Sequence, residues 1–432
     1  MKLKALTSAI VLASLPMTGA FAAALDRSGQ SIGAFLQPGN YFEAGISVLD
    51  PNVSGKVKNG YTPSAAAPPS IVGLENTKIS DMGENYYFPQ AALKLQLNDH
   101  LSFGLIYDQP FGADAAYSSA DASSAAPIPS LNGQGLFSNN GEGTEVEVKT
   151  QNISALIGFQ PNENFNIYGG AVYQTVEGEV QLRGLAYGGP AAFGAYNANF
   201  KEKSGTGWLA GIAYQIPEIA LKTSITYRSE IDHNVTTLES IAGNDMSLYG
   251  YQPGKTKITT PQSVNLDFQT GIMADTVAFA NVRWVNWKKF TLRPEGFNSA
   301  STLIGKLRTG GQYQDGFDLT DYAKDQWSAN VGVGRKLNEQ WAGNISVGYD
   351  SGAGNPISTL GPTDGYWSAG LGVRFSPVPQ YELSLGGKYL WLGDAKVQRG
   401  DYAIPGNVEN AYVGEFKDNH AWAWGGKIAY RF

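Results

Sequence analysis

The sequence has 432 residues, a net charge of -7, three histidines and no cysteine. Without cysteine, the chain forms no disulfide and no thiolate metal site. A negative net charge argues against nucleic acid as a partner, because nucleic acid binds to a basic face. The 53 Gly, 23 Tyr, 19 Phe and 9 Trp residues are typical of a strand-rich membrane protein.

The first 24 residues have the pattern of an export signal. Lys2 and Lys4 precede a short apolar run, Leu6–Leu15, which ends at Pro16. Small residues at 20–24 fit a cleavage site. An uncleaved anchor helix is the alternative, but the apolar run is too short to span a membrane. We therefore predict a signal peptide at residues 1–24.

A short segment rich in Gly and Ser, residues 25–40, precedes the first strand. Composition alone leaves two possibilities open, a flexible tail below a barrel and a small plug inside it. The polar residues at 26–31 could hydrogen-bond to lumenal charges, while Phe35 and Leu36 could seal a pocket from below. A wide barrel cannot be filled by its own side chains. We therefore predict a reduced plug that includes Arg27, Phe35 and Leu36.

Residues 41–432 are predicted to form a transmembrane barrel. Apolar residues recur with the period of two that defines a strand with one apolar face. Short turns and long loops alternate strictly between the strands, as in outer-membrane barrels. The predicted fold class is all-β, a transmembrane antiparallel barrel of fourteen strands. The strands are expected near 41–50, 85–97, 100–111, 145–160, 163–180, 202–216, 219–232, 258–274, 276–289, 321–337, 340–351, 363–376, 380–397 and 415–432.

The last strand shows this pattern most clearly. Its alternate residues Trp422, Trp424, Ile428, Tyr430 and Phe432 are large and apolar, and those between them are small or cationic. Aromatic residues at both ends of one apolar face indicate the two aromatic girdles of an outer-membrane barrel.

Five further segments are informative: Asp50–Gly55, Pro110–Gly112, Tyr227–Glu230, Lys324–Trp327 and Tyr366–Gly372. In order and spacing they resemble the FadL-type transporters (OMPP1/FadL/TodX) of the bacterial outer membrane. That resemblance implies a fourteen-stranded barrel with a lumenal hatch. It also implies a hydrophobic groove between outer loops and a sideways exit at a kinked third strand. The chain departs from the family pattern because its segment before the barrel is shorter and lacks an Asn-Pro-Ala sequence.

The third predicted strand ends at a proline, which cannot donate a hydrogen bond to a sheet. An ordinary strand end is the alternative interpretation. Together with the resemblance, the sequence predicts a kink that opens the wall. The residues assigned to this opening are Gly104, Asp108, Pro110, Phe111 and Gly112.

Two outer loops, 112–144 and 181–201, contain many apolar residues for segments that should face water. Packing of the loops on each other as a lid is one explanation, and a hydrophobic landing groove is the other. Both can hold at once. The groove is predicted to include Leu131, Leu136, Phe137, Leu185, Tyr187, Phe193, Tyr196 and Phe200.

The resemblance places cations for a ligand carboxylate near Lys324 and Arg183. A partly desolvated cation pairs strongly with a carboxylate. The alternative for both residues is a structural ion pair with Asp or Glu.

The function expected from these features is passive uptake of long-chain fatty acids or other hydrophobic compounds across the bacterial outer membrane. A general porin for small polar solutes is the alternative. We expect no enzymatic activity, because three scattered histidines give no evident catalytic base. We expect no cofactor, no metal and no nucleic acid. The expected partners are a hydrophobic ligand, outer-membrane lipid and lipopolysaccharide, and the chain is expected to be a monomer.

Overall fold

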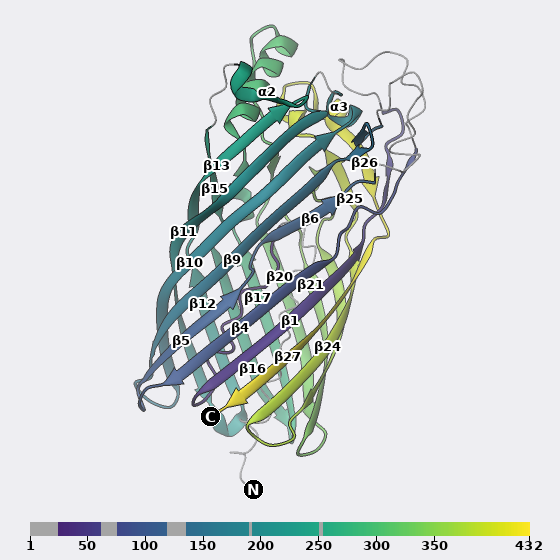
Figure 1. The fold of residues 1–432 in the computed structure, drawn as a ribbon. Coiled ribbons are helices and arrows are strands. Elements are labelled where there is room, and N and C mark those ends of the chain that lie inside the picture. Colours follow the sequence, from purple (N-terminus) through teal and green to yellow (C-terminus); the bar gives the residue numbers. More distant parts are fainter. Residues whose placement is uncertain (1–24, 62–75, 119–134, 190–191, 250–253) are drawn as a thin grey trace.

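A computed structural model describes residues 25–61, 76–118, 135–189, 192–249 and 254–432 (Figure 1). The predicted signal peptide, residues 1–24, lies outside the described residues, and so does Leu131. Among the described residues, no helix is both long and apolar enough to cross a membrane.

A closed barrel of fourteen antiparallel strands, all within the described residues, confirms the predicted fold class. Strands β27 and β1 close it, from Tyr41 opposite Arg431 to Asn52 opposite His420. The wall strands are β1 (Tyr41–Asn52), β4 (Tyr86–Gln96), β5 (Leu101–Asp108), β9 (Glu145–Phe159), β10 (Phe165–Arg183), β11 (Ala195–Ile216), β12 (Leu221–Arg228), β16 (Ser263–Met273), β17 (Thr276–Val285), β20 (Gln326–Lys336), β21 (Trp341–Asp350), β23 (Tyr366–Phe375), β24 (Tyr381–Leu392) and β27 (His420–Arg431).

The period-two pattern of the sequence separates the two faces of this wall. In β27, Trp422, Trp424 and Ile428 are 51%, 45% and 57% exposed and face outward, while the intervening Ala421 and Ala423 are buried. Apolar outward faces and polar or small inward faces are what a bilayer around a filled lumen requires.

Exposed aromatic side chains form a girdle near each end of the barrel. Near the long loops lie Tyr173, Trp208, Trp327, Trp367, Trp391 and Trp422. Near the short turns lie Phe42, Phe159, Phe165, Trp341, Tyr381 and Phe432.

Short turns occupy one end of the barrel, near the C-terminus, and long connections occupy the other (Figure 1). The helices are α2 (Glu295–Thr309), α3 (Val408–Ala411), η3 (Leu185–Tyr187), η4 (Pro217–Ile219), η5 (Met246–Tyr249), η6 (Trp287–Lys289) and η7 (Gly400–Ala403). Strands that extend the wall or join loops are β2 (Gly55–Val57), β3 (Lys78–Ile79), β6 (Gly112–Ala116), β7 (Ser138–Asn139), β8 (Glu142–Gly143), β13 (Ile231–Ile241), β14 (Asn244–Asp245), β15 (Lys255–Thr260), β18 (Thr291–Leu292), β19 (Thr320–Asp321), β22 (Ile357–Ser358), β25 (Ala395–Gln398) and β26 (Tyr412–Phe416).

Residues 25–37, called here the N-terminal segment, pack against inward-facing side chains of the barrel. Ile32 and Phe35 are each 1% exposed and belong to one apolar cluster with Leu156, Tyr168 and Leu209. The ring of Phe35 lies directly against Gly104 in β5, where a Cβ would have no room. Gly104 therefore permits close packing of this segment.

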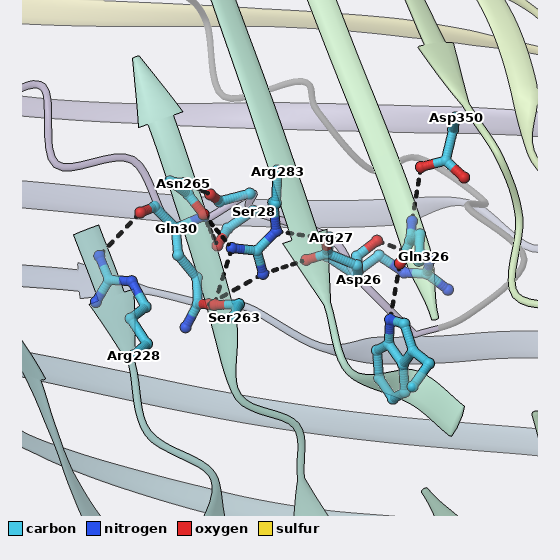
Figure 2. Close-up of polar contacts among 12 residues, drawn as sticks. Asp26, Arg27, Ser28, Gln30, Arg228, Ser263, Asn265, Arg283, Gln326 and Asp350 are labelled. Atoms are coloured by element: carbon cyan, nitrogen blue, oxygen red, sulfur yellow. Dashed lines mark hydrogen bonds and ion pairs between the residues drawn. The ribbon is translucent and has the colours of Figure 1, made fainter. Parts of the chain in front are cut away.

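Buried polar contacts attach the same segment to the wall (Figure 2). Asp26 accepts hydrogen bonds from Arg283 Nε at 2.7 Å and Nη2 at 3.2 Å. Arg228 donates to the carbonyl of Gln30 at 2.8 Å, and Lys94 donates to that of Gln37 at 2.6 Å. These contacts supply hydrogen-bond acceptors to buried cations that would otherwise be costly to place inside a barrel.

Candidate functional site: two cavities and a break in the wall

An apolar cavity of about 80 Å³, called here the inner cavity, lies inside the barrel beside the start of the N-terminal segment. Valines from β9 and β10 form one side of it, and the aromatic rings of Phe111, just before β6, and of Trp287 in η6 form another. Its charged lining residues are Arg27, Asp114 and Glu177. The apolar lining includes Leu25, Phe111, Val146, Val176, Val180, Phe200, Trp287, Phe290, Tyr322 and Leu360.

Trp287 is fixed in the wall of the inner cavity by both its polar and its aromatic contacts. Its indole N–H donates to Gln326 at 2.7 Å, and Gln326 donates to Asp350 at 2.6 Å (Figure 2). Its ring meets those of Phe111 and Tyr322 with centroids 5.4 and 5.2 Å apart. A fully buried indole whose N–H is satisfied presents only its apolar surface to a ligand.

A larger cavity of about 380 Å³, called here the outer cavity, lies among the long loops. Helix α2 supplies one side and the connection between β10 and β11 supplies the other. Its apolar lining includes Leu182, Tyr187, Phe193, Phe297, Ile304, Leu307, Phe317, Leu319 and Leu360.

Two arginines and two aspartates, Asp318 and Asp401, give the outer cavity a charged border. Asp401 accepts hydrogen bonds from Arg308 at 2.7 Å and from Arg399 at 3.0 Å. Burial would raise the pKa of the Asp401 carboxyl, but the nearby Arg399 and Arg308 outweigh burial and hold that pKa below its ordinary value. Arg399 also donates to the carbonyl of Ala186 at 2.9 Å. Loops from distant parts of the sequence are therefore joined at this border.

The wall is interrupted between β4 and the third strand. Pairing of β4 with β5 ends at Ala91 opposite Tyr107. Beyond this point β6 continues the third strand and pairs with β9, from Gly112 opposite Lys149 to Ala116 opposite Glu145. The part of β4 that lies nearer the loops, Tyr86–Gln90, pairs only with β1 among the described strands.

At this break the N-terminal segment takes the place of a strand. Arg27 N–H donates to the carbonyl of Pro110 at 2.7 Å, and Gly112 N–H donates to that of Leu25 at 2.8 Å. The guanidinium of Arg27 lies 4.7 Å from the ring centroid of Tyr86. Residues predicted to form the opening thus contact the N-terminal segment, and the Asp108 carboxylate accepts a hydrogen bond from Ser28.

The residues predicted to form a loop groove are divided among several places. Tyr187 and Phe193 line the outer cavity, and Phe200 lines the inner one. Tyr196 packs its ring 5.3 Å from that of Phe297 and lines neither cavity. Leu136, Phe137 and Leu185 are buried in loop-to-loop packing. Some of the predicted groove residues therefore line cavities, while others pack the loops against each other, and a landing groove for ligand stays a prediction.

The two cations predicted to bind a carboxylate line neither cavity. Arg183 is buried and donates to Glu142 at 2.7 Å and to the carbonyl of Tyr196 at 3.1 Å. Lys324 is exposed and lies near Asp364. Burial raises the pKa of the Asp364 carboxyl, and the positive charge of Lys324 offsets part of that rise. The cations that border the cavities are Arg27, Arg308 and Arg399.

Helix α2 was not predicted from the sequence, because its residues lie in the loop expected between the predicted strands 276–289 and 321–337. Phe297, Ile304 and Leu307 line the outer cavity from this helix. Their spacing of seven and three residues is that of one helical face and was a usable signal. Among the described residues, no group of three or more His, Asp or Glu side chains is arranged to hold a metal ion.

The sequence matches the family of outer membrane protein transport proteins (OMPP1/FadL/TodX) over residues 34–432. The chain belongs to this family. Comparison with curated proteins gives no match. This FadL/TodX-family chain is similar to the structure of a Pseudomonas aeruginosa FadL homologue, with 14% identity, a TM-score of 0.66 and coverage of 93% and 92% of the two chains.

Two toluene transporters also share the fold of this FadL/TodX-family chain. TodX of Pseudomonas putida has 13% identity and a TM-score of 0.56, with 92% of this chain and 91% of that chain covered. TbuX of Ralstonia pickettii has 11% identity and a TM-score of 0.51, with the same coverage. The chain is accordingly an outer-membrane protein of a family that transports hydrophobic compounds. The comparisons give no support to a general porin.

Proposed function

We propose that this protein takes up hydrophobic compounds passively, through the outer cavity, then the inner cavity, then the break beside β6. One observation carries the proposal: two apolar cavities lie in succession, and the inner one borders the strand whose pairing with β4 is lost. Burial of apolar surface supplies about 0.8 kcal/mol per methylene. A ligand therefore gains free energy at each cavity and needs no energy source.

Sideways release is favoured over release straight down the lumen because the path downward is polar. It crosses the buried ion pair of Asp26 with Arg283. Near the short turns it meets a cavity of about 240 Å³ whose lining includes Lys222 and the amides of Gln160, Asn164 and Asn166. That cavity has a mixed lining, which also includes Leu36, Ala213 and Leu221, and a hydrocarbon would disrupt a buried ion pair on the way to it.

The proposed ligands are long, mainly apolar molecules, including fatty acids. The outer cavity is mostly apolar, and Arg308 at its border offers a guanidinium that a ligand carboxylate would share with Asp401. Arg308 is the better candidate for this contact, since Lys324 and Arg183 line neither cavity. Contact with lipopolysaccharide and a monomeric state remain predictions.

The direction of release can be measured in vesicles that contain the purified protein. N-phenyl-1-naphthylamine, an uncharged fluorophore, is added outside the vesicles. A dansylated lipid reports its arrival in the bilayer. Albumin trapped inside the vesicles reports its arrival in the interior. We expect the lipid signal to rise first and the albumin signal to follow. An albumin signal that precedes the lipid signal would exclude sideways release.

A matched pair of variants tests the route. Ala113 lines the inner cavity on β6 at the break, and Ala369 faces outward on β23. Ala113→Trp should slow the protein-dependent lipid signal at least fivefold, while Ala369→Trp should leave it within twofold. Equal rates for the two variants would show that the ligand takes another path.

A further inference from the structure

Leu360 borders both cavities. It lines the inner cavity together with Ile357, Gly361 and Thr363, and it lines the outer cavity together with Thr359. Its side chain is 8% exposed. Residues 357–363, called here the partition, therefore separate the two cavities, and the Leu360 side chain reaches from one to the other.

The backbone of the partition is tied in place. Ile357 of β22 pairs in parallel with Val397 of β25. Gly361 N–H donates to the carbonyl of Ser358 at 3.2 Å, and Thr363 N–H donates to that of Gly361 at 2.8 Å. The side chain of Leu360 makes only van der Waals contacts, so it is the part of the partition that can move at little cost.

Two tyrosines from other loops hold the residue before Leu360. The Tyr117 hydroxyl donates to the carbonyl of Thr359 at 2.6 Å. The hydroxyls of Tyr187 and Thr359 lie 2.9 Å apart. Tyr187 also lines the outer cavity, so a ligand that enters there touches a residue that fixes the partition.

We propose that Leu360 is the gate between the outer and the inner cavity. Rotation of its isobutyl group opens the connection, and separation of Tyr187 from Thr359 favours this rotation. A hydrogen bond between two neutral hydroxyls adds little net stability, so a ligand in the outer cavity can displace it. The volume of the side chain at position 360 then sets both the rate of transfer and the largest ligand that passes. This inference rests on the proposed function, which places the two cavities on one route.

The experiment uses one reporter for each cavity. Because the chain has no cysteine, Leu307→Cys on α2 can be labelled with bimane to report binding in the outer cavity. Trp287 in the inner cavity reports arrival there, because bromobenzene quenches indole fluorescence. The Trp287 signal is the difference between the labelled protein and the same protein with Trp287→Phe. Stopped-flow mixing with bromobenzene, and with the bulkier 1-bromonaphthalene, gives both rates.

Two substitutions should act in opposite directions. Leu360→Trp should slow quenching of Trp287 at least tenfold while the bimane response persists. Leu360→Ala should speed quenching at least threefold and bring the 1-bromonaphthalene rate close to that of bromobenzene. Tyr187→Phe, which removes only the hydroxyl, should speed quenching about twofold. The matched controls are Leu371→Trp and Leu371→Ala, because Leu371 is 69% exposed on the outer face of β23.

Two outcomes would decide against the gate. Quenching rates within twofold of the parent protein for both Leu360 variants, with the bimane response intact, would overturn the gate and leave the proposed function standing. If bromobenzene moved neither signal in the parent protein, the proposed function would fail, and the gate with it. Should Leu360→Trp fail to fold, the accelerations expected for Leu360→Ala and Tyr187→Phe still decide the question.

Discussion

Among single residues, Asp26 and Arg283 show how this barrel tolerates charge in its lumen. Both side chains are almost fully buried, at 3% and 1% exposure, and their atoms approach to 2.7 Å. Arg283 also donates to Asn265 at 2.7 Å and to Gln30 at 3.0 Å. A buried ion pair is tolerable only when further hydrogen bonds satisfy it, as they do here. The pair therefore fixes the start of the N-terminal segment.

The first prediction is that Asp26→Ala releases this segment. Removal of one partner of a buried ion pair costs about 3–5 kcal/mol, because the other charge is left unpaired. Ala34→Cys, at a buried position of the segment in a chain without cysteine, reports the release by its reaction with a maleimide. Reaction should be at least tenfold faster in the Asp26→Ala background. Adding Arg283→Met to Asp26→Ala should reverse most of the change in reaction rate. An unchanged rate with Asp26→Ala alone would show that the apolar contacts of the segment suffice to hold it in place.

The second prediction concerns recognition of a carboxylate. Arg308→Met should weaken binding of a fatty acid by about 1 kcal/mol, the size of one partly exposed charge pair, and should leave a hydrocarbon of equal length unaffected. Isothermal titration with both ligands measures the difference. Lys324→Met is the matched control, because Lys324 lies at neither cavity. If Lys324→Met weakened fatty-acid binding more than Arg308→Met, the carboxylate would be bound by Lys324, as the sequence analysis predicted, and not by Arg308.

Among the elements, the strands were predicted from the sequence and the outer helix α2 was missed. The wall strands follow from a period of two, since each side chain faces either lipid or the lumen. Pro110 marked the break, because proline has no N–H to donate to a neighbouring strand. The pairing of residues 25–27 with 110–112 could not be predicted, since nothing local in either segment specifies the other. The cavities could not be predicted either, because residues far apart in the sequence, such as Leu25, Phe200 and Leu360, come together only in the folded barrel.

The third prediction concerns how α2 is held over the outer cavity. The Glu239 carboxylate on β13 accepts hydrogen bonds from the N–H groups of Gly296 at 2.8 Å and Phe297 at 2.7 Å. It thereby caps the first turn of α2, where a negative charge is also favourable. Glu239→Ala should destabilise the helix by about 1–2 kcal/mol, raising amide hydrogen exchange in residues 295–309. If the exchange rates of residues 295–309 in Glu239→Ala equalled those of the parent protein, apolar packing alone would hold α2.

Across the whole molecule, the two apolar cavities and the buried cations that contact the N-terminal segment lie at different levels of the barrel. The cavities, the aromatic clusters and the break lie toward the long loops, whereas the cations Lys94, Lys222 and Arg228 contact the N-terminal segment nearer the short turns. Fourteen strands enclose more space than their own side chains fill. We therefore propose that the N-terminal segment separates the ligand path from the periplasm, a separation that would favour the proposed release into the wall.

The last prediction follows from that separation. Replacing residues 26–37 by a Gly-Ser linker of the same length removes the buried contacts of Asp26, Phe35 and Gln37 while keeping the chain length. Small polar solutes should then pass through the lumen, since a Gly-Ser chain is flexible and packs poorly. Hydrolysis of nitrocefin by a periplasmic β-lactamase in whole cells should rise several-fold over cells with the parent protein. Heat-dependent mobility in gels checks that the variant barrel is folded. A folded variant with unchanged nitrocefin entry would mean that the inward-packed loops, and not the N-terminal segment, seal the pore.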